Sequence, residues 1–272
     1  DSSTSRGLGD VYKRQVYYIE GQDNIGKSTV IKELKKRELI SPKTTVDYHR
    51  FPTHKMTNYM TLFNNLINDM KFNNRVSKTD IGKLIEVTMD VLINDMKYTF
   101  SNHSILNRAE ISICDRGPLS TYLYQYKHYC EVMGIDLPEE VNLHNFFYNV
   151  VLSDDNSKIP LVINRNIIIL TNEHNIELPK DNTETIKYKT EYDNNQKLQD
   201  RIKTDINTIK DLIKSDKDQY SIGNFNFYTI DIGSSTDSNL NKERKSTEDI
   251  CDEIENIITS NYNNSKMNEE DK

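Results

Sequence analysis

A glycine-rich segment near the start of the chain has the residues needed to bind phosphate groups. An apolar run, VYYIE at 16–20, leads into G-x-x-x-x-G-K-S at 21–28, and a helical pattern follows. Gly21 and Gly26 allow the backbone to curl until successive N–H groups point inward at phosphate oxygens. Lys27 supplies a positive charge for the β- and γ-phosphates, and Ser28 supplies an oxygen for Mg²⁺. Because a strand and a helix are expected on either side, the spacing predicts a phosphate-binding loop.

An acid at the end of a later apolar strand is the second candidate site residue. The segment ISIC at 111–114 is expected to be a strand, and Asp115 and Arg116 follow it directly. In a chain that already has a phosphate loop, such an aspartate is placed to organise Mg²⁺. The alternative is that Asp115 only caps the next helix. We favour the metal role because Arg116 stands beside it, so Ser28 and Asp115 are the predicted metal-binding pair.

The elements that must position these residues alternate along the chain. Apolar or β-branched runs predict strands at 16–20, 44–50, 111–114, 166–170 and 224–232. Apolar residues at helical spacing predict helices after residue 28 and at 56–70, 78–100, 119–133, 138–152, 188–213 and 250–258. Such alternation predicts an α/β fold with three layers, in which a five-stranded parallel sheet is flanked by helices. The loops after the first three strands then meet at one edge of the sheet, where ligands bind in such folds.

The composition excludes several classes of protein. The net charge of −7 over 272 residues includes no basic stripe, so we expect no nucleic-acid polymer as a partner. No apolar run is long enough to cross a membrane, so we expect no membrane partner. Cys114, Cys130 and Cys251 lie far apart without metal-ligand spacing, which indicates a reduced, cytoplasmic protein.

The sequence divides into three segments, of which the first and the last are expected to lack a fixed structure. Residues 1–15 lack periodicity and are expected to be a non-native or disordered leader. Residues 16–260 form the predicted phosphate-loop domain, in which the polar stretch 171–190 is a candidate lid. The charged, Asn-rich residues 261–272 are expected to be a disordered tail.

Three motifs in this order resemble the thymidylate kinase family of P-loop nucleoside monophosphate kinases. They are EGQDNIGKST at 20–29, RFP at 50–52, and DRGPLSTYLYQ at 115–125. The family patterns are F-E-G-x-D-x-x-G-K-[ST], R-[FE]-P and D-R-Y-x-x-S-x-x-A-[YF]-Q. The third is the most specific, because phosphate loops alone occur in many unrelated activities.

This resemblance implies a P-loop kinase fold and an activity. The expected reaction is ATP- and Mg²⁺-dependent phosphorylation of a deoxynucleoside monophosphate, dTMP to dTDP. The implied partners are small-molecule nucleotides and a second copy of the chain, because family members are commonly dimers.

Site residues follow from the same resemblance, position by position. The implied catalytic residues are Lys27, Asp115 and Arg116. The implied ATP-binding residues are Gly21, Asn24, Ile25, Gly26, Lys27, Ser28 and Thr29. The implied monophosphate-binding residues are Asp23, Phe51, Pro52, His54, Lys55, Arg116, Ser120, Thr121, Tyr124 and Gln125.

The chain departs from the family pattern where arginines are expected, which indicates a divergent member, with a viral or phage origin as one interpretation. The loop has Asn24 and Ile25, and residues 171–200 contain no arginine, leaving Lys180, Lys187 or Lys189 as substitutes. Two alternatives therefore stay open. One is a deoxynucleoside kinase with Glu20 as the base, and the other is a catalytically weakened nucleotide-binding protein.

Overall fold

Strand β1 (Gln15–Glu20) is the centre of the fold. All six of its residues are buried. Val16 and Tyr18 pack into one hydrophobic cluster, while Tyr17 and Ile19 pack into another. A strand that is buried on both faces must lie inside a covered sheet, as parallel strands do. The apolar run before the glycine-rich segment is therefore the core strand that the sequence predicts.

The computed structural model describes eleven stretches of the chain: residues 15–50, 109–127, 142–143, 145–147, 164–173, 176, 178, 189–215, 221–222, 225–235 and 242–270. The predicted helices at 56–70 and 78–100 lie outside these stretches. So does all of the expected leader except Gln15.

Six strands form one sheet in the order β2-β3-β1-β4-β6-β5. Five of them run parallel, as their registers show. The prediction of a five-stranded parallel sheet is confirmed, and the two-residue strand β5 extends it as an antiparallel edge. Beyond β1, the bounds are β2 (Val46–Arg50), β3 (Ile111–Asp115), β4 (Asn164–Thr171), β5 (Ser221–Ile222) and β6 (Phe225–Asp231).

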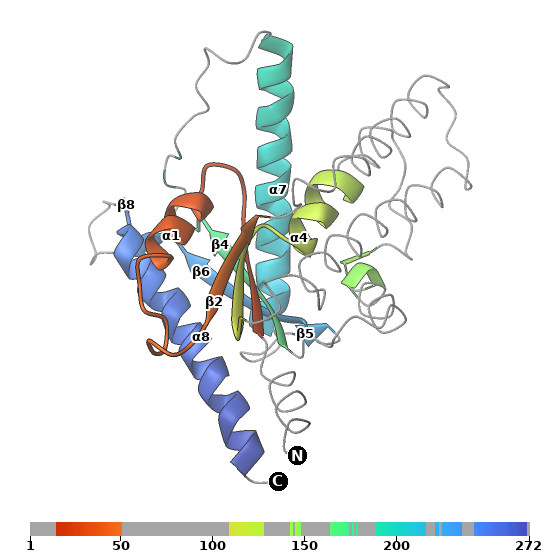
Figure 1. Ribbon diagram of the computed structural model, residues 1–272. Coiled ribbons are helices and arrows are strands. Elements are labelled where there is room, and N and C mark those ends of the chain that lie inside the picture. Colours follow the sequence, from red (N-terminus) through yellow and green to blue (C-terminus); the bar gives the residue numbers. More distant parts are fainter. Residues whose placement is uncertain are drawn as a thin grey trace.

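Helices cover both faces of this sheet, which gives the predicted three layers (Figure 1). Helices α1 (Lys27–Leu34) and α8 (Thr247–Glu270) pack on one face. The other face is covered by α4 (Pro118–Ser120), the π-helix η4 (Thr121–Lys127) and α7 (Lys189–Ser215). The described chain thus has the three-layer α/β architecture that the alternating pattern predicts.

A small antiparallel ribbon stands at the carboxyl end of β6. It consists of β7 (Gly233–Ser235) and β8 (Lys242–Arg244), with Gly233 opposite Arg244. Two backbone hydrogen bonds attach it to the sheet: Ile232 N–H donates to Thr171 O at 2.9 Å, and Lys245 N–H donates to Ile232 O at 2.8 Å. The ribbon is therefore held beside the carboxyl edge of the sheet.

Helix α8 continues past the residue where the sequence predicts a disordered tail. It runs to Glu270, and Tyr262 is only 6% exposed. The Tyr262 hydroxyl donates to a carboxylate oxygen of Glu110 at 2.6 Å. The reason is periodicity: Tyr262 extends the buried stripe of Ile250, Ile254 and Ile258 by one more step of four residues. Among the described residues, no helix is long and apolar enough to cross a membrane.

Candidate active site

The glycine-rich segment turns sharply between β1 and α1. Gly21 and Gly26 have φ values of 142° and 105°, and Asn24 has φ 62°. A Cβ added to Gly21 would stand 2.8 Å from the carbonyl oxygen of Leu170 at the end of β4. The positive φ and this close approach both require glycine at position 21. The predicted phosphate loop therefore has the tight turn that the motif needs, and α1 begins directly at its end.

Lys27 lies folded back along the loop. Its Nζ donates to the carbonyl oxygens of Gly21 and Gln22 at 2.8 and 2.7 Å. The side chain is buried, and burial together with the positive charge of Arg116 lowers the pKa of Lys27 to about 8. A cation held by the carbonyl oxygens of the turn is placed to exchange these partners for phosphate oxygens.

Ser28 and Asp115 meet as the sequence predicts. Ser28 Oγ donates to Asp115 Oδ2 at 3.0 Å. The parallel register of β1 and β3 places Ile19 opposite Asp115, so the carboxylate lies beside the loop that follows β1. The other oxygen, Oδ1, is buried and has no hydrogen-bond partner in the described part of the chain. The Asp115 carboxylate, with one oxygen unpaired, and the Ser28 hydroxyl are oxygen donors. Such a small set suits Mg²⁺, which proteins usually hold by one or two side chains together with substrate phosphates and water.

Arg116 and Asp23 form an ion pair across the mouth of the loop. Arg116 has φ 69°, and its guanidinium lies 5.0 Å from the centre of the Tyr124 ring. Gln199, on α7, bonds to Asp23 twice, because it accepts from the Asp23 N–H and donates to Asp23 Oδ2, both at 2.9 Å. The Tyr124 hydroxyl also donates to Gln199 Oε1 at 3.4 Å. These contacts join the loop, η4 and α7 into one polar cluster.

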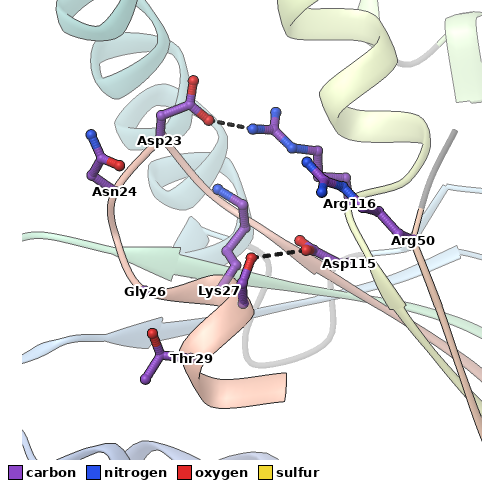
Figure 2. Close-up of a pocket in the computed structure, with 9 residues that line it drawn as sticks. Asp23, Asn24, Gly26, Lys27, Thr29, Arg50, Asp115 and Arg116 are labelled. Carbon is purple, nitrogen blue, oxygen red and sulfur yellow. Dashed lines mark hydrogen bonds and ion pairs between the residues drawn. The ribbon is translucent and has the colours of Figure 1, made fainter. Parts of the chain in front are cut away.

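These side chains line a cavity of about 450 Å³ (Figure 2). Three cations reach it from three different elements: Lys27 from α1, Arg50 from the end of β2, and Arg116 after β3. Figure 2 shows Arg50 and Arg116 side by side, facing Lys27 and the acid Asp115. The remaining lining residues are Asp23, Asn24, Gly26, Ser28 and Thr29. A cavity of this size with three cations is suited to a multiply charged anion of small-molecule size.

Two of the predicted monophosphate-binding residues point inward. Ser120 and Thr121 are both buried. Ser120 gives its N–H to one carboxylate oxygen of Glu20 and its hydroxyl to the other. Thr121 Oγ1 donates to the Gly117 carbonyl at 3.4 Å. In this structure, Ser120 therefore ties the segment after β3 to the end of β1, and burial raises the pKa of Glu20.

Gly117 stands where the thymidylate kinase pattern has a tyrosine. The ring of Tyr18 lies against this glycine and leaves no room for a side chain there. A Cβ at position 117 would lie 2.3 Å from Cδ1 of Tyr18. The backbone of Gly117 is extended at φ −178°, so it imposes no conformational need for glycine. The Tyr18 ring on β1 therefore occupies the space that a side chain at position 117 would need.

The remaining predicted site residues are not placed. Phe51, Pro52, His54 and Lys55 lie outside the described residues, and nothing is described for the side chain of Gln125. Of the candidate lid, the structure describes only residues 171–173, 176, 178, 189 and 190, so the lid stays a prediction.

Two cavity-associated residues are missing from the predicted site. Arg50 belongs to the Arg-Phe-Pro motif, so its own motif was the signal that could have identified it. Gln199 is one of several amides in a polar stretch, NNQKLQ at 194–199, and nothing in the sequence distinguishes it from its neighbours. Its contact with Asp23 depends on how α7 packs against the sheet.

Comparisons with known proteins give matches among solved structures. No protein-family model and no curated protein sequence matches the chain. A thymidylate kinase from Candida albicans is similar at 19% identity and a TM-score of 0.44, covering 92% of this chain and 93% of that one. A thymidylate kinase from Ehrlichia chaffeensis is similar at 15% identity and a TM-score of 0.41, covering 90% of this chain and 99% of that one.

Proposed function

We propose that this protein is an ATP-dependent nucleoside monophosphate kinase. The observation that carries the proposal is the meeting of Lys27, Arg50 and Arg116 in one cavity beside the Ser28–Asp115 pair. Two nucleotides that exchange a phosphoryl group bring several negative charges together, and positive groups are needed to offset their repulsion. A single bound phosphate group would not need three cations from three elements.

Phosphoryl transfer between two nucleotides requires positive charge and alignment of the two phosphates, and it requires no strong base. An oxygen of the acceptor phosphate, already an anion near neutral pH, forms the new bond to the γ-phosphorus, and the bond to the β–γ bridging oxygen breaks to leave ADP. Lys27 would hold the β- and γ-phosphates, while Arg50 and Arg116 would hold the acceptor phosphate in line with them. Ser28 and Asp115 would hold Mg²⁺, which neutralises charge on the transferred group when it is bound.

We propose dTMP as the acceptor, following the motif resemblance. Asp23 is placed to accept from a sugar hydroxyl beside the phosphate held by Arg116, since the two side chains are already paired. The Tyr124 ring lies against the same guanidinium, where it can also contact a pyrimidine. Together these positions support a deoxynucleoside monophosphate next to η4.

A deoxynucleoside kinase needs a base for the 5'-hydroxyl, and the described site offers a poor one. Glu20 is 1% exposed, both of its carboxylate oxygens accept from Ser120, and it does not line the cavity. The third possibility, a nucleotide-binding protein with little turnover, is favoured by Asn24 and Ile25 in the loop. Arg50 is an observation against it, because a sensor of ATP alone has no use for a cation on the acceptor side.

The test is a coupled assay of ADP release with ATP and Mg²⁺, using dTMP, dUMP, dCMP, dGMP and thymidine as acceptors. Turnover with dTMP above the other acceptors is the expected result. Turnover only with thymidine would overturn the proposal in favour of a nucleoside kinase. Tight dTMP binding without turnover would favour the binding protein.

Two further expectations accompany this function. Cys114 and Cys251 are buried free thiols, which supports the proposal of a reduced, cytoplasmic location. The homodimer implied by the motif resemblance stays a prediction, and light scattering coupled to gel filtration would test it.

A further inference from the structure

Two residues of the cavity are ion-paired with each other. Asp23, in the phosphate loop, and Arg116, directly after β3, both line the cavity and form a salt bridge. Figure 2 shows the two side chains reaching toward each other. They are 30% and 26% exposed, so the pair lies partly open to the cavity and partly buried. The carboxylate proposed above to bind the sugar and the guanidinium proposed to bind the phosphate are therefore each other's partners.

Each member of the pair has a second anchor that does not involve the ion pair. Gln199 holds the backbone N–H and the carboxylate of Asp23 with two hydrogen bonds of 2.9 Å. The guanidinium of Arg116 lies over the Tyr124 ring, 5.0 Å from its centre. A guanidinium can turn in its own plane while its face stays on an aromatic ring. Arg116 can therefore exchange Asp23 for another anion while Gln199 keeps Asp23 in place.

A phosphate group alone gains little from Arg116. The guanidinium would serve two anions at once, because Asp23 Oδ1 already accepts from its Nη2. A phosphate monoester is largely doubly charged near neutral pH, and its repulsion by a carboxylate at this range offsets part of the attraction. If Arg116 turns fully to the phosphate instead, Asp23 loses its cation. In both cases the ion pair weakens the binding of a bare phosphate monoester.

A nucleoside alone gains little from Asp23. Its hydroxyl would have to replace Arg116, which exchanges a contact between two ions for a hydrogen bond from a neutral donor. A nucleoside monophosphate carries both groups on one sugar. Its phosphate accepts from Arg116, and its hydroxyl donates to the Asp23 oxygen that Nη2 leaves. Each of these contacts makes the other one easier to form.

Resting on the kinase function proposed above, we propose that the Asp23–Arg116 ion pair makes the acceptor site selective for molecules that carry a phosphate and a sugar hydroxyl together. Molecules with only one of these groups can replace only one member of the pair. Inorganic phosphate and nucleosides therefore compete poorly with a nucleotide. The selectivity comes from a contact that the wrong ligand fails to displace, in addition to the contacts that the correct ligand makes.

The experiment measures calorimetric binding of dTMP and of its 3'-deoxy analogue, which lacks the single free hydroxyl of dTMP. The original chain should prefer dTMP by about 20-fold, as expected for a hydrogen bond to a charged group. Asp23→Asn removes the charge and leaves an amide of the same size. This variant should bind the 3'-deoxy analogue about fivefold more tightly than the original chain does, because Arg116 no longer has to leave an anion. Affinity for dTMP should not rise, so the preference should fall to about fourfold or less.

Three further variants separate the ion pair from other effects. Asp23→Ala also lacks the charge and should show the same gain for the 3'-deoxy analogue, so the result does not depend on the Asn amide. Gln199→Ala loosens Asp23 but keeps its charge, so it should show no gain. Asp252→Asn is the matched control, because it removes the acid of another arginine–aspartate pair, bonded to Arg37 at 2.5 Å and outside the cavity lining. It should leave both affinities within about twofold.

Three results would overturn the proposal. Unchanged affinity of Asp23→Asn for the 3'-deoxy analogue would make Asp23 a simple ligand of the hydroxyl. Weaker affinity would make it a residue that orients Arg116 for the phosphate. Binding of neither monophosphate to the original chain would overturn this inference together with the function on which it rests. Failure of the kinase function alone is distinguishable because binding is read without turnover: the dependence on Asp23 would persist while ATP and dTMP release no ADP.

Discussion

Asp23 and Gln199 are 176 residues apart and are joined by a pair of hydrogen bonds. The Asp23 N–H donates to Gln199 Oε1, and Gln199 Nε2 donates to Asp23 Oδ2, each at 2.9 Å. One amide thus holds both the backbone and the side chain of a loop residue. Since Asp23 is also paired with Arg116, the acceptor side of the cavity has its geometry fixed from α7.

Gln199→Ala should therefore harm the acceptor side more than the donor side. Hydrogen bonds to charged groups contribute about 1.5–3 kcal/mol, so we expect kcat/KM for dTMP to fall about tenfold or more. The KM for ATP should stay within about twofold, because the hydrogen bonds of Lys27 and Ser28 go to Gly21, Gln22 and Asp115. Steady-state kinetics with each substrate varied in turn measures both values. Thr208→Ala, an exposed change on the same helix, is the control, and a loss shared equally by both substrates would contradict this role.

Binding of ATP should depend on pH through Lys27. Its pKa is lowered to about 8, so the free protein loses this charge as the pH rises through that value. Bound phosphates favour the charged form and raise the pKa. Affinity for ATP is thus fully present below about pH 8 and falls by up to about tenfold per pH unit above it. Titrations between about pH 7 and 10 would show the decline, and Lys27→Arg should flatten it because a guanidinium stays charged in this range.

Arg50→Ala should lower turnover without preventing donor binding. Loss of a charge-assisted contact to the acceptor phosphate should reduce kcat/KM for dTMP by about 100-fold, and Arg50→Lys should recover part of it. Calorimetric affinity for ATP alone should change by less than about threefold. If Arg50→Ala weakened ATP binding as much as it weakened dTMP turnover, Arg50 would belong to the donor side instead.

Gly117→Ala should destabilise the fold through one contact. The added Cβ would meet the Tyr18 ring at 2.3 Å, and overpacking of this kind costs about 1–3 kcal/mol of unfolding free energy. Tyr18→Leu removes the ring, so the pair Tyr18→Leu and Gly117→Ala should be less destabilised than the sum of the two single changes. Urea unfolding of the four proteins measures this coupling, and simple additivity would show that the ring is not the obstacle.

The sequence predicts the elements well where periodicity is strong. The long helix expected at 188–213 is α7 at Lys189–Ser215, and the loop, Ser28 and Asp115 meet as expected because motif spacing and strand order place them together. The hydrogen bonds of Gln199 to Asp23 and of Arg244 to the Ile25 carbonyl could not be predicted in this way. They join distant segments through single side chains in polar stretches, and neither propensity nor alternation distinguishes such a residue from its neighbours.

The end of α8 shows a related limit. Residues from 261 on are polar in composition, and composition predicts disorder. One buried tyrosine, Tyr262, repeats the spacing of Ile254 and Ile258, and α8 continues past it to Glu270. A single apolar residue at helical spacing is therefore weak evidence for a helix in the sequence, although its side chain is buried in the fold.

The packing of the first helix against the last has a consequence for synthesis of the chain. The apolar face of α1, formed by Val30, Ile31 and Leu34, shares its cluster with Ile250 and Ile254 of α8. A nascent chain that has not yet reached α8 lacks this part of the cluster, so α1 is covered only by the remaining residues of the cluster, those of β1 and β3 among them. A chain that ends before α8 therefore carries the complete phosphate-loop motif on a helix that has lost part of its apolar packing. Chaperones and proteases would recognise that fragment by its exposed apolar surface.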